Sequence, residues 1–151
     1  MSSRPVRTRV VGALSILYGL LLGLFWASII WLRGKDGMRE LTSSMLLFVP
    51  NAAVLVLLPA AGVALCSGRI GEPDARALKL ATVVALAVKA AGTGYWAVEL
   101  ILATGRFSDW LHSVGWQTLA LEVLPSIGWS VVLALTPVSS APPVASAEAR
   151  S

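Results

Sequence analysis

Charged residues are scarce in this chain of 151 residues. Only 13% are Asp, Glu, Lys or Arg, whereas 56% are hydrophobic. Soluble domains carry about 25% charged residues, so an ordinary soluble domain is excluded. No charge occurs in the 23 residues from Val10 to Leu32 or in the 28 residues from Leu41 to Gly68. Because about 20 apolar residues suffice for a helix to cross the hydrocarbon layer, both runs predict membrane spans.

Cysteine and histidine are almost absent. Cys66 is the only cysteine and His112 is the only histidine. This excludes an intramolecular disulfide, a CxxC redox pair and a metal or haem site built from several such ligands. Motifs of the GxSxG, HExxH, P-loop and dinucleotide-binding kinds are absent as well. We therefore expect no catalytic residues, no metal and no cofactor, and we interpret His112 as a structural residue of an outer loop.

Two more apolar stretches, each with an internal charge, are long enough to cross a bilayer. The sequence thus predicts an all-α fold, a four-helix transmembrane bundle with up-down-up-down topology. A basic amino terminus (1–9) precedes the membrane domain (10–136). A tail rich in Pro, Ala and Ser (137–151), predicted to be disordered, follows it. The expected spans are about 10–32, 43–67, 73–103 and 113–136.

The positive charges indicate an orientation. Seven lie in the amino terminus, the second loop and the tail (Arg4, Arg7, Arg9, Arg69, Arg76, Lys79, Arg150), and four lie in the first and third loops (Arg33, Lys35, Arg39, Arg106). By the positive-inside rule both termini are expected to be cytoplasmic. Aromatic rings at the predicted outer ends of the spans agree with this orientation (Trp31, Phe107, Trp110, Trp116). The positive residues form no basic face with interleaved aromatics, so no nucleic-acid partner is expected.

Small residues recur at every fourth position of the first span. Ser15, Gly19, Gly23 and Ala27 share one face of that helix. In lipid such a ridge lets two helix backbones approach closely and gain van der Waals contact. The partner of this helix-packing ridge is either another span of the same chain or another subunit, and the sequence leaves both open.

Ionisable residues inside the membrane define a candidate polar site. Lys89 lies near the centre of the third span and Glu122 near the centre of the fourth, with Ser126 one turn further on. An unpaired charge at the bilayer centre costs about 2.5 to 3.5 kcal/mol, so pairing of Lys89 with Glu122 is expected. Asn51, next to Pro50 in the second span, is a further polar candidate. By contrast, Glu99 is expected to reach the headgroup layer.

The pair has two interpretations. In the first, it is a relay for protons or ions or a binding site for a polar substrate. In the second, it is a neutralised pair that fixes helix register and transports nothing. We predict a multi-pass, non-catalytic component of a membrane complex, acting in helix packing or assembly. The alternative is a small transporter or channel subunit with a Lys89/Glu122 polar centre. The expected partners are the lipid bilayer and either a second copy or another membrane protein. Small size, compact loops and a preference for Arg over Lys favour a bacterial cytoplasmic membrane.

Overall fold

The computed structural model describes residues 5–43, 45–67, 70–104 and 119–138. This part of the chain is helical almost throughout and contains no strand. Its elements are α1 (Val6–Ser43), α2 (Met45–Ser67), α3 (Glu72–Thr104), η1 (Leu119–Val123) and α6 (Leu124–Leu135). The predictions for His112, for residues 1–4 and 113–118, and for the tail from residue 139 lie outside the described residues.

Three of the helices are long and apolar enough to cross a membrane: Val6–Ser28, Phe48–Ser67 and Glu72–Glu99. The chain is therefore a multi-pass membrane protein. The fourth apolar segment, Leu119–Leu135, has 17 residues. At 1.5 Å per residue it extends about 25 Å, somewhat less than a hydrocarbon layer of about 30 Å.

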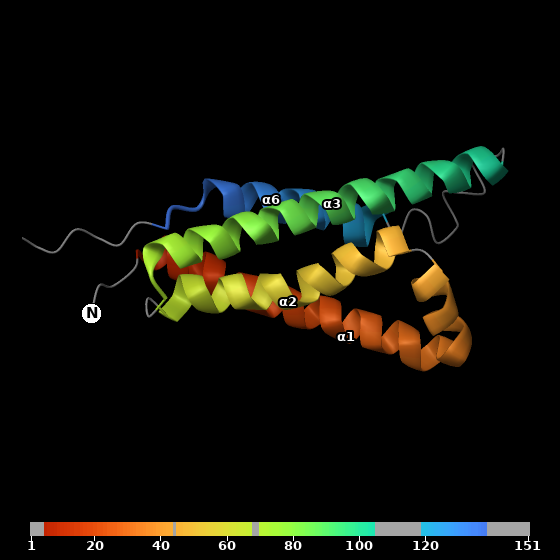
Figure 1. Ribbon diagram of the computed structural model, residues 1–151, viewed down its shortest axis with the longest axis horizontal. Helices are drawn as coiled ribbons and strands as arrows, with labels where there is room; N and C mark the ends of the chain where they lie inside the picture. Colours follow the sequence, from red (N-terminus) through yellow and green to blue (C-terminus); the bar gives the residue numbers. More distant parts are fainter. Residues whose placement is uncertain (1–4, 44, 68–69, 105–118, 139–151) are drawn as a thin grey trace, which may run out of the picture.

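Helix α1 is longer than the predicted first span. It continues to Ser43 through Arg33, Lys35 and Arg39, where a loop was expected. Charged residues end burial in lipid but do not break a helix, because Arg, Lys and Glu are good helix formers. In Figure 1 the last turns of α1 bend away from the axis of its first part.

The helices pack in chain order. Helix α2 lies between α1 and α3, and α3 also packs against η1 and α6. The chain reverses direction from each of these helices to the next, as the colours in Figure 1 show. Contact between α1 and α6 is much looser than between the other neighbours. The four helices are therefore antiparallel to their neighbours in chain order, and a weak seam lies between the first and the last, α1 and α6.

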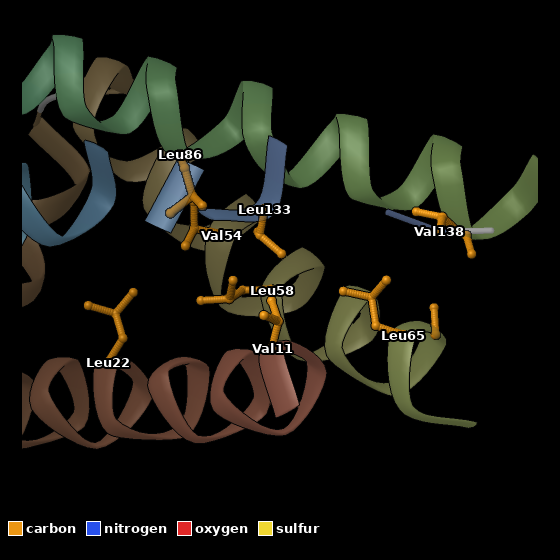
Figure 2. Close-up of a cluster of buried hydrophobic side chains, with 10 residues drawn as sticks. Val11, Leu22, Val54, Leu58, Leu65, Leu86, Leu133 and Val138 are labelled. Atoms are coloured by element: carbon orange, nitrogen blue, oxygen red, sulfur yellow. The ribbon is translucent and has the colours of Figure 1, made fainter. Parts of the chain in front are cut away.

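The core lies between these helices. Figure 2 shows side chains from α1, α2, α3 and α6 directed toward one another, among them Val11, Leu58, Leu86 and Leu133. Large apolar side chains are also exposed on the outer faces, including Leu80 at 63%. An apolar exterior of this extent suits lipid.

The small-residue ridge of α1 packs against α2. A Cβ atom on Gly19 would lie 2.8 Å from Cγ of Pro59, and one on Gly23 would lie 3.8 Å from Cδ2 of Leu55. Ser15 is fully buried, whereas Ala27 is exposed. The two glycines of the ridge thus pack against α2, a span of the same chain.

Helices α1 and α2 also approach closely at Gly12, a residue outside the predicted ridge. A Cβ there would lie 2.8 Å from the carbonyl oxygen of Gly62, and a Cβ on Gly62 would lie 2.6 Å from that of Gly12. Real Cβ atoms do not approach backbone oxygen so closely. Each glycine is therefore required by the backbone of the other helix.

One end of the structure is held by hydrogen bonds between helices. The Lys79 ammonium donates to the carbonyl oxygens of Ala134 at 3.3 Å and Thr136 at 2.9 Å. The Thr8 hydroxyl donates to the carbonyl of Pro137 at 3.1 Å. Residues 137 and 138 were predicted to begin the disordered tail, but Val138 is buried in the core. An apolar valine with a packing partner gains more from burial than the Pro- and Ser-rich residues around it.

Candidate functional site

Helix α3 carries Lys89 deep into the membrane-spanning region. The helix starts in a sequence suited to a helix amino terminus, with Glu72 and Asp74 in its first turn, where acidic groups face the positive end of the helix dipole. Lys89 lies ten residues beyond Lys79, or about 15 Å along the axis. It lies ten residues before the exposed Glu99. Lys89 therefore lies midway along α3 between Lys79 and Glu99, within the candidate span Glu72–Glu99.

The structure brings three of the predicted site residues together. Nζ of Lys89 lies 3.1 Å from Oε2 of Glu122 and 3.4 Å from Oγ of Ser126. The Lys89 side chain is 0% exposed and that of Glu122 is 10% exposed. These two are the only buried charged residues among the side chains that the structure describes, at positions 5–28, 31, 48–67, 70–99 and 119–138. Their opposite charges neutralise each other at a depth where a single charge would be costly.

Glu122 belongs to a local irregularity of its helix. Residues Leu119–Val123 form a π-helical turn, and α6 continues directly from Leu124. Pro125 has no N–H to donate to the carbonyl of Leu121, and its ring would clash with that carbonyl in a regular α-helix. A wider turn relieves the clash. Turns of this kind are rare and occur frequently at functional sites.

Tyr18 of α1 approaches the same group of residues from across the weak seam. Its ring lies against Trp129, with ring centroids 5.8 Å apart and planes tilted by 59°. Its hydroxyl is buried and lies near Ser126 and Glu122. That hydroxyl makes no hydrogen bond of ordinary geometry within the described residues. Tyr18 thus adds an incompletely satisfied polar group to the ion pair.

Asn51 lies on α2 at the level of Lys89. The Thr82 hydroxyl donates to the carbonyl of Leu57 at 3.2 Å, which fixes the register of α2 and α3. Since the two helices run in opposite directions, Lys89, seven residues after Thr82, corresponds to Pro50, seven residues before Leu57, and Asn51 is the next residue. Asn51 is 6% exposed there. On α3, Thr93 is buried one turn beyond Lys89, and its hydroxyl finds no hydrogen-bond partner among the described residues.

The group combines opposite charges with uncharged polar side chains. It offers a carboxylate, hydroxyls and a resident ammonium. Within the described residues, no group of three His, Cys, Asp or Glu side chains could hold a metal ion. Compared with known proteins, the chain matches no family model, no curated protein and no solved structure. The site must therefore be interpreted from its own geometry.

An apolar groove of about 340 Å³ lies beside the site. It runs between α1 and α6, where contact between the helices is weakest. Tyr18 and Trp129 line it together with Leu17, Pro125 and Gly128. Lys89, Glu122 and Ser126 are not among the residues that line it, so the groove is an apolar surface next to the site.

A second apolar groove, of about 560 Å³, lies between α2 and α3. Small side chains line much of it, including Ala77, Ala81 and Ala85 of α3 and Ala53 of α2. These alanines are at four-residue spacing on α3, as in ridges that pack helices closely in membranes.

Sequence reasoning did not find three features of the site. It did not include Tyr18, although this residue carries the only phenolic hydroxyl of the first span. It also did not include Thr93, one turn from Lys89. The available sequence signal for the π-helical turn was Pro125, which leaves the carbonyl of Leu121 beside Glu122 without its helical donor.

Proposed function

We propose that the protein is a small transporter whose central site is the Lys89–Glu122 pair and which exchanges a monovalent cation for a proton. The observation that carries this proposal is the burial of both charges at mid-depth, 3.1 Å apart, with Ser126 as a further ligand. Ionisable residues within membrane spans are rare and characteristically mark ion or substrate pathways.

The exchange follows from charge balance. Glu122 carries one negative charge, and the Lys89 ammonium neutralises it in the resting state. A substrate cation that binds Glu122 would leave two positive charges on one carboxylate unless Lys89 released its proton. Binding of one cation therefore expels one proton, and return of the proton to Lys89 expels the cation. The net charge of the buried site stays at zero in both states, which avoids the cost of a lone charge in lipid.

The π-helical turn supports movement at the site. A π-helical turn holds one more residue than the corresponding α-helical turn, so a change between the two forms rotates the side chains of that turn. Glu122 lies within this turn, and its carboxylate could thus change its orientation without displacement of α6. Such a local change requires little free energy, and it offers a way to alternate the side of the membrane from which the site can be reached.

We further propose an up-down-up-down membrane topology with both termini in the cytoplasm, in a bacterial cytoplasmic membrane. The described positive residues Arg7, Arg9, Arg76 and Lys79 support this orientation by the positive-inside rule. They lie where α1 and α3 begin, at the end where Lys79 contacts the end of α6.

The test measures the yield of folded protein first and the release of protons across a liposome membrane second. Lys89→Met and Glu122→Leu should each lower the yield of folded protein, because each leaves one buried charge unpaired, at a cost of about 3 to 5 kcal/mol. The double variant should recover that yield, since two apolar side chains replace the pair. The recovered double variant is then reconstituted into liposomes that contain a pH-sensitive dye.

Sodium, potassium and methylammonium are added outside the liposomes in turn, and proton release is followed. We expect the wild type to release protons in response to at least one of these cations and the double variant to release none. A double variant that folds and exchanges as the wild type does would refute the transport proposal and leave the pair with a structural role alone.

An assembly component of a membrane complex is the second candidate function. The α1 ridge does not favour it, because α2 covers Gly19 and Gly23. The α2–α3 groove does favour it, because its alanine-lined surface is open and fits a further helix from a second copy or another membrane protein. Ala81→Leu should then reduce the native mass of the detergent-extracted protein, and an unchanged mass would count against this role.

A further inference from the structure

We infer that ordered water molecules bind between the helices at the level of the Lys89–Glu122 pair, where the indole of Trp26 and the hydroxyl of Thr93 are their ligands. This inference goes beyond the proposed function, because a water site requires no transport. It rests on unpartnered polar atoms that the fold buries at one depth, on the chemistry that these atoms demand, and on the small side chains around them.

Trp26 reaches the level of the ion pair from α1. Gly23 of α1 lies opposite Leu55 of α2, and the two helices run in opposite directions. Three residues after Gly23, Trp26 therefore corresponds to the position next to Asn51 of α2, which is itself at the level of Lys89. Trp26 packs against the buried core, and its indole nitrogen is buried with no hydrogen-bond partner among the described residues.

Thr93 reaches the same level from α3. Lys79 of α3 donates to the carbonyl of Thr136, directly beyond α6. Because α3 and α6 are antiparallel, Thr93, fourteen residues after Lys79, corresponds to Glu122, fourteen residues before Thr136. Thr93 is 3% exposed, and its hydroxyl has no hydrogen-bond partner in the described part of the chain. A threonine hydroxyl in a helix can donate to the carbonyl four residues earlier, as that of Thr82 does, but the Thr93 hydroxyl does not.

Two more polar atoms without a partner among the described residues lie on the other side of the pair. They are the hydroxyl of Tyr18, near Ser126, and the indole nitrogen of Trp129, whose ring is in contact with that of Tyr18. Buried polar side-chain atoms in native proteins nearly always have a partner, and ordered water supplies it where the protein does not. Such atoms, gathered around one ion pair from α1, α3 and α6, therefore indicate bound water.

The chemistry of these atoms selects the ligand. An indole nitrogen donates a hydrogen bond and accepts none, so a ligand of Trp26 must offer a lone pair, which excludes a metal cation or an ammonium at this position. An anion would add an uncompensated negative charge beside Glu122 in a lipid environment. A small neutral molecule that both accepts and donates meets the requirements, and water is the smallest. The Thr93 hydroxyl can bond to water in either direction.

The side chains next to Thr93 on α3 are small. They are Ala90 and Ala97, which are both buried, and the half-buried Gly94. A Cβ atom on Gly94 would meet no other atom within 4 Å, so the backbone there borders open space. A water molecule takes up about 30 Å³ in the liquid and needs two to four polar partners. Small side chains beside several polar atoms favour both conditions.

The experiment compares two buried threonines of α3. Thr82 and Thr93 are 0% and 3% exposed, but only the Thr82 hydroxyl is hydrogen-bonded within the described residues, to the carbonyls of Leu57 and Leu78. Valine keeps the shape of threonine and lacks its hydroxyl. The variants are therefore Thr93→Val, Thr82→Val as the matched control, and Thr93→Ser, which restores a hydroxyl.

The wild type and the variants are labelled with ¹⁵N and reconstituted into liposomes. Solid-state NMR then measures the transfer of magnetisation from water protons to the indole N–H of Trp26, and Trp26→Phe assigns that signal. The exposed guanidinium group of Arg7 is the positive control. The backbone amide of Leu58, in the apolar core, is the negative control.

We expect transfer to the Trp26 indole in the wild type that exceeds transfer to the Leu58 amide. Thr93→Val should lose most of it, because the bound water loses one of its ligands, whereas Thr93→Ser and Thr82→Val should retain it. Thr93→Val should also unfold at lower dodecyl sulfate than the wild type. A dry, unpartnered hydroxyl predicts the opposite shift, since valine would relieve the cost of burying it.

Three results would overturn the inference: wild-type transfer at Trp26 no greater than at Leu58, a Thr93→Val variant more stable than the wild type, or unchanged transfer at Trp26 in a folded Thr93→Val variant. If that variant does not fold, the wild-type transfer alone decides. Neither measurement involves cation exchange, so the proposed function is tested separately by proton release in liposomes.

Discussion

Gly19 and Gly23 lie one turn apart on the same face of α1, yet alanine is expected to affect them in opposite directions. At Gly19 a new Cβ would lie 2.8 Å from Cγ and 3.0 Å from Cδ of Pro59. The proline ring is fixed to its backbone and cannot rotate away. At Gly23 the nearest atom is Cδ2 of Leu55 at 3.8 Å, an ordinary van der Waals distance.

The magnitude follows from two contributions. Replacement of glycine by alanine favours a helix by up to about 1 kcal/mol at either position. Overpacking at Gly19 costs about 1 to 3 kcal/mol, because the helices must move apart by several tenths of an ångström. Gly23→Ala should therefore stabilise the fold slightly and Gly19→Ala should destabilise it. The helix-propensity contribution is common to both, so the difference of about 1 to 3 kcal/mol isolates the steric overlap.

The assay is unfolding of the purified protein in mild detergent by added dodecyl sulfate, followed by tryptophan fluorescence and circular dichroism. The midpoint should shift to lower dodecyl sulfate for Gly19→Ala and to equal or higher dodecyl sulfate for Gly23→Ala. The native mass should be the same for both variants, because the face is covered within one chain. If Gly19→Ala were at least as stable as Gly23→Ala, the assigned contact of α1 with Pro59 would be incorrect.

Three further substitutions test other parts of the structure. Pro125→Ala supplies an N–H that can bond to the carbonyl of Leu121, so the π-helical turn should tighten, amide exchange there should slow, and cation-driven proton release should fall. Lys79→Met removes the cap from the end of α6 and should lower stability by about 1 kcal/mol, with faster amide exchange confined to that end, whereas Lys79→Arg should retain most of the stability. Thr82→Val removes a bond between helices and should cost about 0.6 kcal/mol in dodecyl sulfate unfolding, whereas Ser130→Ala, which removes an exposed bond within one helix, should cost less.

Much of the fold could be predicted because the relevant signals are local. The long charge-free runs indicated membrane helices, and the ends of α2 and α3 fell within two residues of the expected limits. Short connections imply antiparallel neighbours, and this was enough to place Lys89 and Glu122 within reach of each other. The side-chain contact at 3.1 Å is consistent with that reasoning, while its functional role stays a prediction.

The remaining features depend on information that a single helix does not contain. The contact of Gly12 with Gly62 is set by the angle and register of two helices, and no spacing within α1 indicates where Gly62 will lie. Tyr18 joins the site across the seam between the first and last helices, which are not neighbours in sequence. The continuation of α1 through Arg33 could not be inferred from its charge. A charged residue indicates where a segment leaves the lipid, but it does not indicate where the helix ends.

The separation of Lys89 from Glu122 along the chain has a consequence for biosynthesis. The two residues are 33 positions apart, so at about 5 to 20 residues per second the ribosome adds Glu122 about 2 to 7 seconds after Lys89. During this interval α3 carries an uncompensated lysine, and its membrane-spanning segment has the lowest hydropathy of the three candidate spans. The nascent third helix thus bears the cost of a lone lysine in lipid, about 2.5 to 3.5 kcal/mol, until the glutamate follows. Formation of the ion pair is thus a late event in the synthesis of the chain, and it relieves a cost that the third helix carries from its own insertion.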